Sequence, residues 1–167
     1  MTLCWLYLKG KAMKSLFQRL LILFLIPMGS SSVWADEPLD LSQYKGKQAV
    51  YIDFWASWCG PCRQSFPWLN QMNSRYAEQG LKVIAVNVDS DRDDAIEFLA
   101  EHPSNFQVIY DPKGVLAERF GIQGMPSAVL ISREGEVVSQ HIGFKQDRAE
   151  HYEQSIKQLL AEGEQGE

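Results

Sequence analysis

Residues 49–62 read AVYIDFWASWCGPC, an apolar segment that leads directly into two cysteines separated by two residues. The segment 49–55 is short, β-branched and aromatic, which predicts a strand buried on both faces of a largely parallel sheet. Apolar side chains then recur at helical spacing, so a helix is expected to begin at Cys59 and to end at Gly80. Cys59 and Cys62 are therefore expected where a buried strand gives way to a helix.

Beyond this stretch the chain alternates strand-like and helix-like segments. Strands are predicted at residues 81–88, 106–110, 127–132 and 136–142, and helices at residues 91–101, 113–120 and 146–161. In the first of these helices the residues expected on the buried face are Ala95, Ile96, Leu99 and Ala100. Strands that alternate with helices predict a parallel sheet, and the final hairpin adds antiparallel strands. The predicted fold class is α/β, with helices on both faces of a central mixed sheet.

The first 35 residues have the layout of a secretory signal. A basic segment precedes the apolar run 20–26, and small residues follow it up to Ala35. We therefore predict a signal peptide over residues 1–35, cleaved after Ala35, and a single domain over residues 36–167. The apolar run is shorter than the ~20 residues that span a bilayer, which leaves an uncleaved membrane anchor as the weaker alternative. Met13 is an alternative start, because the signal is already complete from there.

The balance of charge argues against one class of function. The chain carries 21 acidic and 16 basic residues, a formal net charge of −5 at pH 7. An acidic chain without a clustered basic stripe repels phosphate backbones, so we expect no nucleic-acid partner.

The cysteine count points to chemistry at the close pair. The chain has three cysteines, and Cys4 lies in the predicted signal peptide, which leaves Cys59 and Cys62. A disulfide across two residues closes too small a loop to add much stability. Thiol–disulfide exchange, by contrast, needs a nucleophilic thiolate and a second thiol nearby. A helix N-terminus favours the Cys59 thiolate, and Cys62, one turn further, would resolve the mixed disulfide. Copper binding and an inert disulfide stay open as interpretations, whereas zinc would need two further ligands.

The motif and its surroundings resemble a known family. Residues 53–62 closely resemble the active-site segment of thioredoxins, and Pro67 resembles the proline that kinks the following helix. Residues 124–127 resemble the cis-proline loop of that family, and Gly143 resembles a later glycine near the site. Residues 91–110 add a helix and a strand, which resembles the TlpA/ResA-like group of secreted thiol:disulfide reductases. The resemblance implies a thioredoxin-like three-layer sandwich with this inserted helix-strand segment.

The same resemblance implies roles at the site. Cys59 would be the attacking thiolate and Cys62 the resolving thiol, with Gly60 and Pro61 completing the motif. Asp53 would lie buried under the pair and exchange a proton with Cys62, a task that suits the raised pKa expected of a carboxyl group in an apolar strand. The implied substrate-binding residues are Trp58, Met125 and Pro126, with Pro126 in a cis peptide bond and Trp55 also flanking the site.

These expectations combine into a function. Gly60 and Pro61 place no positive charge beside the Cys59 thiolate, which predicts a reductant. The expected enzyme is a protein-disulfide reductase of the periplasm, a monomer that needs no metal and no cofactor beyond the Cys59–Cys62 disulfide. Its expected partners are disulfide-bonded exported proteins and, from the family resemblance, a membrane thiol electron donor. The alternative is a copper-binding or peptide-binding, chaperone-like module of the same fold.

Overall fold

The structure, a computed structural model, describes residues 39–162. Its elements in chain order, with η for a 3-10 helix, are η2 (Leu41–Tyr44), β1 (Ala49–Trp55), α2 (Gly60–Tyr76), η3 (Ala77–Gln79), β2 (Leu81–Asn87), α3 (Arg92–Glu101), β3 (Gln107–Tyr110), α4 (Val115–Arg119), β4 (Ser127–Ile131), β5 (Val137–Ile142), η4 (Gln146–Arg148) and α5 (Ala149–Glu162). The predicted signal peptide lies outside the described residues. Within the described range, no helix has both the length and the apolar character needed to cross a membrane.

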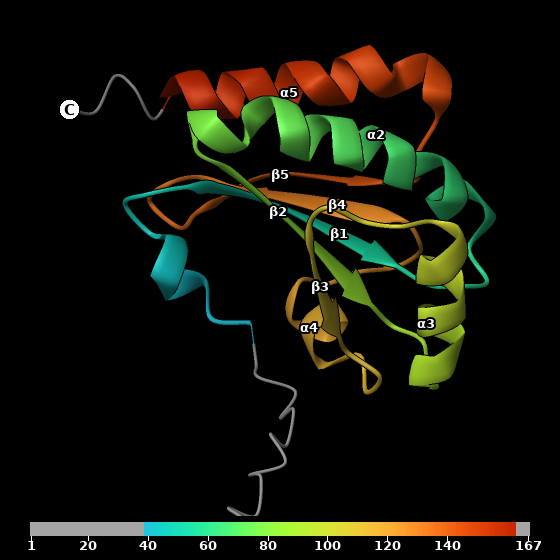
Figure 1. Ribbon diagram of the computed structural model, residues 1–167. Helices are drawn as coiled ribbons and strands as arrows, with labels where there is room; N and C mark the ends of the chain where they lie inside the picture. The colour runs from blue at the N-terminus through green and yellow to red at the C-terminus, as the bar shows by residue number, and fades with distance from the viewer. Residues whose placement is uncertain (1–38, 163–167) are drawn as a thin grey trace, which may run out of the picture. The chain divides into compact units, whose positions relative to one another are not determined.

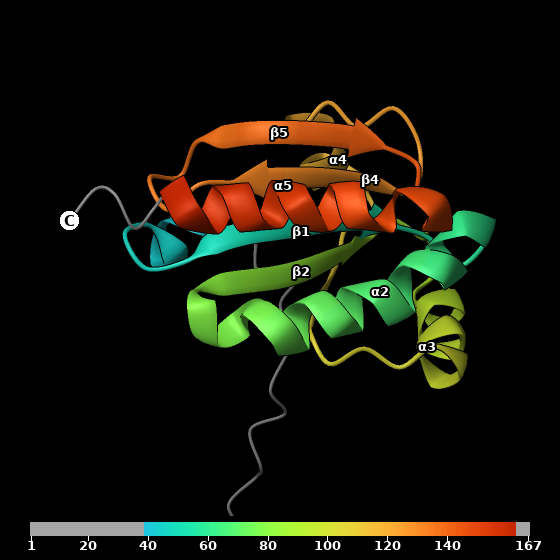
Figure 2. The ribbon, with the colours of Figure 1, turned by 90° about the horizontal axis from the view of Figure 1, so that it is seen from above.

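The five strands form one mixed sheet in the order β3-β2-β1-β4-β5. β1, β2 and β3 run parallel, whereas β4 is antiparallel to β1 and β5 is antiparallel to β4. In Figures 1 and 2, α2 and α5 lie side by side on one face of the sheet, and α4 lies on the opposite face. The expected three-layer sandwich is therefore confirmed.

The central strand β1 connects the two halves of the core. All seven of its residues are buried, as predicted for a strand covered on both faces. Because successive side chains of a strand point to opposite faces, Tyr51 and Trp55 belong to the core cluster that includes α2 and α5. Ile52 and Phe54 belong to the cluster that includes α4. Packing on both faces holds β1 in position, and the cysteine motif follows directly after this buried strand.

The inserted helix α3 shows one error in the predicted packing. Ala95 is buried as expected, but Ile96 is 51% exposed and Ala100 is also exposed. The main inward residue is instead Phe98, whose ring lies 4.7 Å from the Trp55 ring and 5.0 Å from the Phe66 ring. The helix contacts the core through a narrow stripe, so Ile96 falls on the solvent side.

Candidate active site

The redox motif starts α2, as the spacing predicts. Cys59 is the N-cap of the helix, and Pro61 occupies the first turn, where its missing N–H leaves no hydrogen bond unmade. Cys59 and Cys62 form a disulfide with an S–S distance of 2.05 Å. The Cys62 amide donates to the Cys59 sulfur at 3.3 Å. Cys59 is 3% exposed and Cys62 is fully buried, so Cys59 is the more accessible residue of the pair.

Asp53 lies on the strand that leads into the motif. It is 3% exposed, and in the sheet it pairs with Ala85 on one side and Ala128 on the other. Its Oδ2 atom is buried without a hydrogen-bond partner. Burial raises the pKa of Asp53 well above its ordinary value, because an ion costs more in an apolar interior than in water. The raised pKa expected from the sequence is therefore confirmed.

A second buried aspartate, Asp89, anchors the loop that precedes the motif. It lies two residues after the end of β2 and accepts hydrogen bonds from the Ser57 amide at 2.9 Å and from the Ser57 hydroxyl at 3.0 Å. The Asn87 side-chain amide donates to the same carboxylate at 2.7 Å. On the other side of the loop, Arg63 donates to the Ser57 carbonyl at 3.3 Å. All of the polar groups of Ser57 are thus held, which fixes the start of the Trp58–Cys59 segment.

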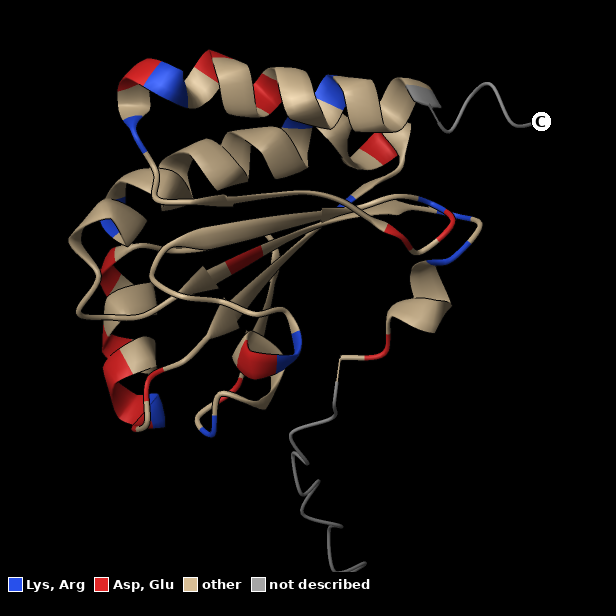
Figure 3. Cartoon of the chain, turned by 180° about the vertical axis from the view of Figure 1, so that it is seen from behind, with Lys and Arg blue, Asp and Glu red and all other residues tan. Residues whose placement is uncertain are grey.

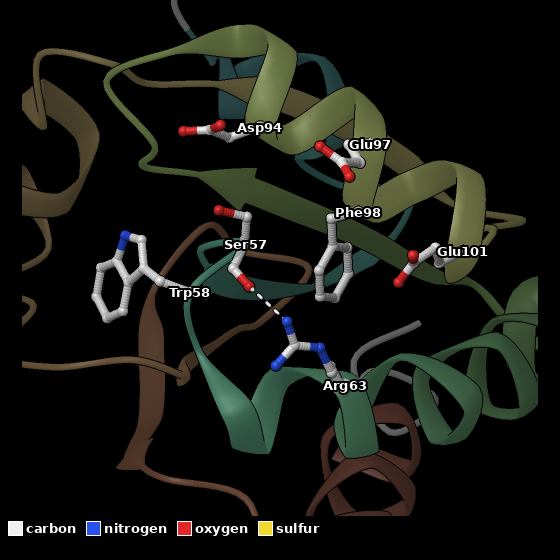
Figure 4. A pocket seen from close by; sticks show the side chains of 7 residues that line it. All are labelled: Ser57, Trp58, Arg63, Asp94, Glu97, Phe98 and Glu101. Carbon is white, nitrogen blue, oxygen red and sulfur yellow. Dashed lines mark hydrogen bonds between the residues drawn. The ribbon is translucent and has the colours of Figure 1, made fainter.

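A cleft of about 300 Å³ lies beside the motif, between the start of α2 and the inserted helix α3. Figure 4 shows three carboxylates from α3 along one wall, and Ser57 and Arg63 on the opposite wall. The residues that line the cleft are Ser57, Trp58, Arg63, Asp94, Glu97, Phe98 and Glu101. Seen from behind in Figure 3, acidic residues are concentrated on α3. A molecule that approaches the disulfide from this side meets a mainly acidic surface.

Trp58 and Trp55 differ sharply in exposure. Trp58 is 69% exposed and stands at the cleft beside Cys59, so its indole is available to a partner. Trp55 is fully buried and packs edge-on against Phe66 at 4.9 Å. Trp55 therefore supports the motif from within the core, and Trp58 is the tryptophan exposed beside it.

The proline loop precedes β4 and lies at the same end of the sheet as the cysteine motif. The Met125–Pro126 peptide bond is cis, as predicted. Ser127, which follows it, pairs with Phe54 near the end of β1, so this loop and the cysteine loop are neighbours. The Gly143 amide donates to the Pro126 carbonyl at 2.7 Å, and this bond ties the loop to the end of β5. Gly143 therefore lies at the site, in agreement with the sequence-based expectation.

Within residues 39–162, no group of three or more histidine, cysteine or acidic side chains is placed to share a metal ion.

Asp89, Ser57 and Arg63 are parts of the site that the sequence analysis does not identify. The one available signal was that Asp89 follows a predicted parallel strand, and ligand-binding residues gather at the carboxyl ends of such strands. Nothing in the sequence indicated that its partner would be Ser57.

Comparison with known proteins places this geometry in context. A family model described as Redoxin matches residues 32–159. The thiol-disulfide oxidoreductase ResA of Bacillus thuringiensis subsp. konkukian is 28% identical over 121 residues, which cover 72% of this chain and 68% of that protein. A solved structure assigned as the thiol:disulfide interchange protein DsbE of Chlorobium tepidum is 50% identical, with a TM-score of 0.70, and the match covers 73% of this chain and 86% of that one. The exposed lipoprotein thioredoxin of Streptococcus pneumoniae is 30% identical with a TM-score of 0.62, covering 71% and 89%.

Proposed function

Since the chain belongs to the redoxin family, we propose that it reduces disulfide bonds of exported proteins by cycling Cys59 and Cys62 between dithiol and disulfide. The chain is a thiol:disulfide oxidoreductase with a thioredoxin-like fold. The observation that carries the proposal is the Cys59–Cys62 disulfide at the start of α2.

The reaction begins with the Cys59 thiolate of the reduced enzyme. It attacks one sulfur of the substrate disulfide, forms a mixed disulfide and releases the other substrate sulfur as a thiolate. The helix N-terminus at Cys59 supports this role, because unpaired backbone N–H groups and the helix dipole stabilise a thiolate there. Cys62 is fully buried in the first turn, a position suited to the second step and not to the first.

The second step needs a base near Cys62. The Cys62 thiol loses its proton to the Asp53 carboxylate and attacks the Cys59 sulfur. The Cys59–Cys62 disulfide forms and the second substrate sulfur leaves as a thiolate. The two substrate thiolates take protons from solvent, so the substrate gains two electrons and two protons. Asp53 returns its proton to Cys62 when a donor reduces the enzyme again. The raised pKa of Asp53 supports this role, because a base works best when its pKa lies near the working pH.

Substrate contacts are proposed for three residues around the disulfide. Trp58 offers an exposed indole, which can cover an apolar side chain next to the substrate disulfide. Met125 precedes the cis proline Pro126 and is partly buried against both core clusters. Its backbone lies in the loop beside the motif, where an extended substrate segment could pair with it as an added strand.

The reducing direction follows from the charges around Cys59. Gly60 and Pro61 add no cation to the motif, and the cleft beside it carries Asp94, Glu97 and Glu101 against the single cation Arg63. Negative surroundings disfavour the thiolate and so disfavour a strongly oxidising enzyme. The enzyme would act outside the cytoplasm after loss of residues 1–35. A membrane thiol donor would reduce the Cys59–Cys62 disulfide again there, and the enzyme would need no metal or other cofactor.

The test is to trap the substrate. Cys62→Ser removes the resolving thiol, so the variant should accumulate disulfide-linked complexes through Cys59 when expressed in cells with its leader. Non-reducing electrophoresis and mass spectrometry would identify the partners, and Cys59→Ser is the matched control that should trap nothing. Equal complexes with both variants would contradict the proposed roles. A reduction potential of the wild-type pair above roughly −180 mV would overturn the reductase direction.

A further inference from the structure

A row of four residues across the sheet places a histidine in line with Asp53. Asp53 pairs with Ala85 and with Ala128, and Ala128 pairs in turn with His141 of β5. Directly paired residues of neighbouring strands point to the same face of a sheet. The row Ala85–Asp53–Ala128–His141 therefore lies on one face, and both side chains next to Asp53 are single methyl groups. Within this row, His141 is the other titratable side chain.

His141 is also bonded to a neighbour of Asp53 on β1. Its Nε2 atom shares a hydrogen bond of 3.2 Å with the Tyr51 hydroxyl. Tyr51 is two residues before Asp53, so the two side chains lie on the same face of β1. Tyr51 is buried, whereas His141 on the edge strand is partly exposed. The Tyr51–His141 hydrogen bond thus links β1, near Asp53 in the sequence, to the edge strand β5.

The ring of His141 is held from the helix side as well. It stacks on Tyr152 of α5 with ring centroids 4.4 Å apart and planes at 15°. The titratable groups that contact or act on His141 are Tyr51 of β1, and Tyr152 and His151 of α5. Burial lowers the pKa of His141, an effect that the Gly143 backbone opposes and that His151 reinforces. The imidazole is therefore mostly neutral at pH 7, as a hydrogen-bond partner inside a core should be.

We propose that His141 acts through Tyr51 to keep Asp53 able to ionise, and that it is a positioning residue for the proton transfer between Cys62 and Asp53. The inference rests on the proton-transfer role proposed above for Asp53. A carboxyl group between two alanines depends on whatever dipoles remain near it. Tyr51 interacts electrostatically with Asp53, and its hydrogen bond with His141 fixes the Tyr51 hydroxyl.

The experiment measures the step that uses Asp53. Reduced protein is mixed with Ellman's reagent: Cys59 attacks and releases one chromophoric thiolate, and Cys62 then releases the second. Both phases are followed across a pH range of about 5 to 9. His141→Phe keeps the stacking on Tyr152 but removes both ring nitrogens. It should slow the second phase roughly fivefold near pH 7, about the effect of losing one hydrogen bond, and move its pH profile to higher pH.

Several variants separate this effect from a loss of structure. His151 also faces the Tyr152 ring, with centroids 6.3 Å apart, but lies exposed on α5. His151→Phe is therefore the matched control and should match wild type. His141→Gln, which retains a hydrogen-bonding side chain, should recover part of the rate. Tyr51→Phe removes the same hydrogen bond from the buried side, so it tests the proposal even if His141→Phe does not fold.

The decisive comparison is the double variant. If His141 acts through Asp53, adding His141→Phe to Asp53→Asn should change the second phase no further. A His141→Phe profile that overlays wild type, or an undiminished effect in the Asp53→Asn background, would overturn the inference while leaving the role of Asp53 intact. A second phase unaffected by Asp53→Asn alone would instead refute the proposed role of Asp53, and the inference with it.

Discussion

Two buried aspartates stand at the base of the redox motif, and they differ in their partners. Asp53 lies inside β1, and Asp89 lies two residues beyond the end of β2, the strand paired with β1. Both are almost inaccessible to solvent, at 3% and 4% exposure. Asp89 accepts three hydrogen bonds, whereas Asp53 has a buried oxygen with no partner and a raised pKa.

The difference assigns the two carboxyl groups to different tasks. A buried carboxylate is stable when several donors replace the water it has lost. Asp89 meets that condition, and two of its three donors belong to Ser57 in the loop that it fixes, so its hydrogen bonds support the architecture. Asp53 lacks such donors, and burial raises its pKa well above the ordinary value. The unpartnered carboxyl group is the one suited to exchange a proton with Cys62.

The largest expected effect is kinetic and belongs to Asp53. Asp53→Asn preserves the shape of the side chain but cannot accept a proton, so the attack by Cys62 on the mixed disulfide should slow about 100-fold at pH 7. Stopped-flow measurement of the two phases with Ellman's reagent checks this. The first phase, the attack by Cys59, is the internal control. If both phases keep their wild-type rates, Asp53 is an ordinary buried residue and the comparison fails.

The cysteine motif was predictable because its parts are consecutive in the sequence. The sequence predicts the strand at residues 49–55 with its observed bounds, since it is apolar apart from Asp53 and bounded by turn signals. Cys59 follows at once, and the helix begins after it. Local sequence is sufficient here because the strand, the turn and the helix N-terminus lie within residues 49–62 and need no distant partner.

The remaining parts depend on contacts between distant segments. Ser57 and Asp89 are 32 positions apart, and Tyr51 and His141 are 90 apart. Those contacts are set by the register of β1 with β2 and of β4 with β5, and hydrophobic periodicity does not specify register between strands. The same limit explains the error in α3: Ile96 and Phe98 are both apolar, and only the position of Trp55 and Phe66 decides that Phe98 points inward.

The next largest effect is on stability and belongs to Asp89. Asp89→Ala removes three hydrogen bonds and leaves the side-chain amide of Asn87, which is fully buried, without this acceptor. The free energy of unfolding of the oxidised protein should fall by about 2 kcal/mol. Urea denaturation followed by circular dichroism measures it. Ser57→Ala removes a single hydroxyl donor and should cost about 1 kcal/mol. A loss for Asp89→Ala no larger than for Ser57→Ala would show that Asp89 does not anchor the loop.

The smallest effect has the opposite sign and tests the unpartnered state of Asp53 directly. Because burial raises its pKa from the ordinary 3.8, the folded protein holds a proton that the unfolded chain releases above that pH. The free energy of unfolding should therefore be highest below the unfolded pKa and decline as the pH rises toward the folded pKa, by at most ~1.4 kcal/mol per pH unit. Asp53→Asn abolishes this decline, so the oxidised variant should become progressively more stable than wild type as the pH rises. Urea titrations of both proteins at several pH values would measure the difference. A difference that does not grow with pH would mean that Asp53 ionises as easily in the folded protein as in water, and the contrast with Asp89 would then have no electrostatic basis.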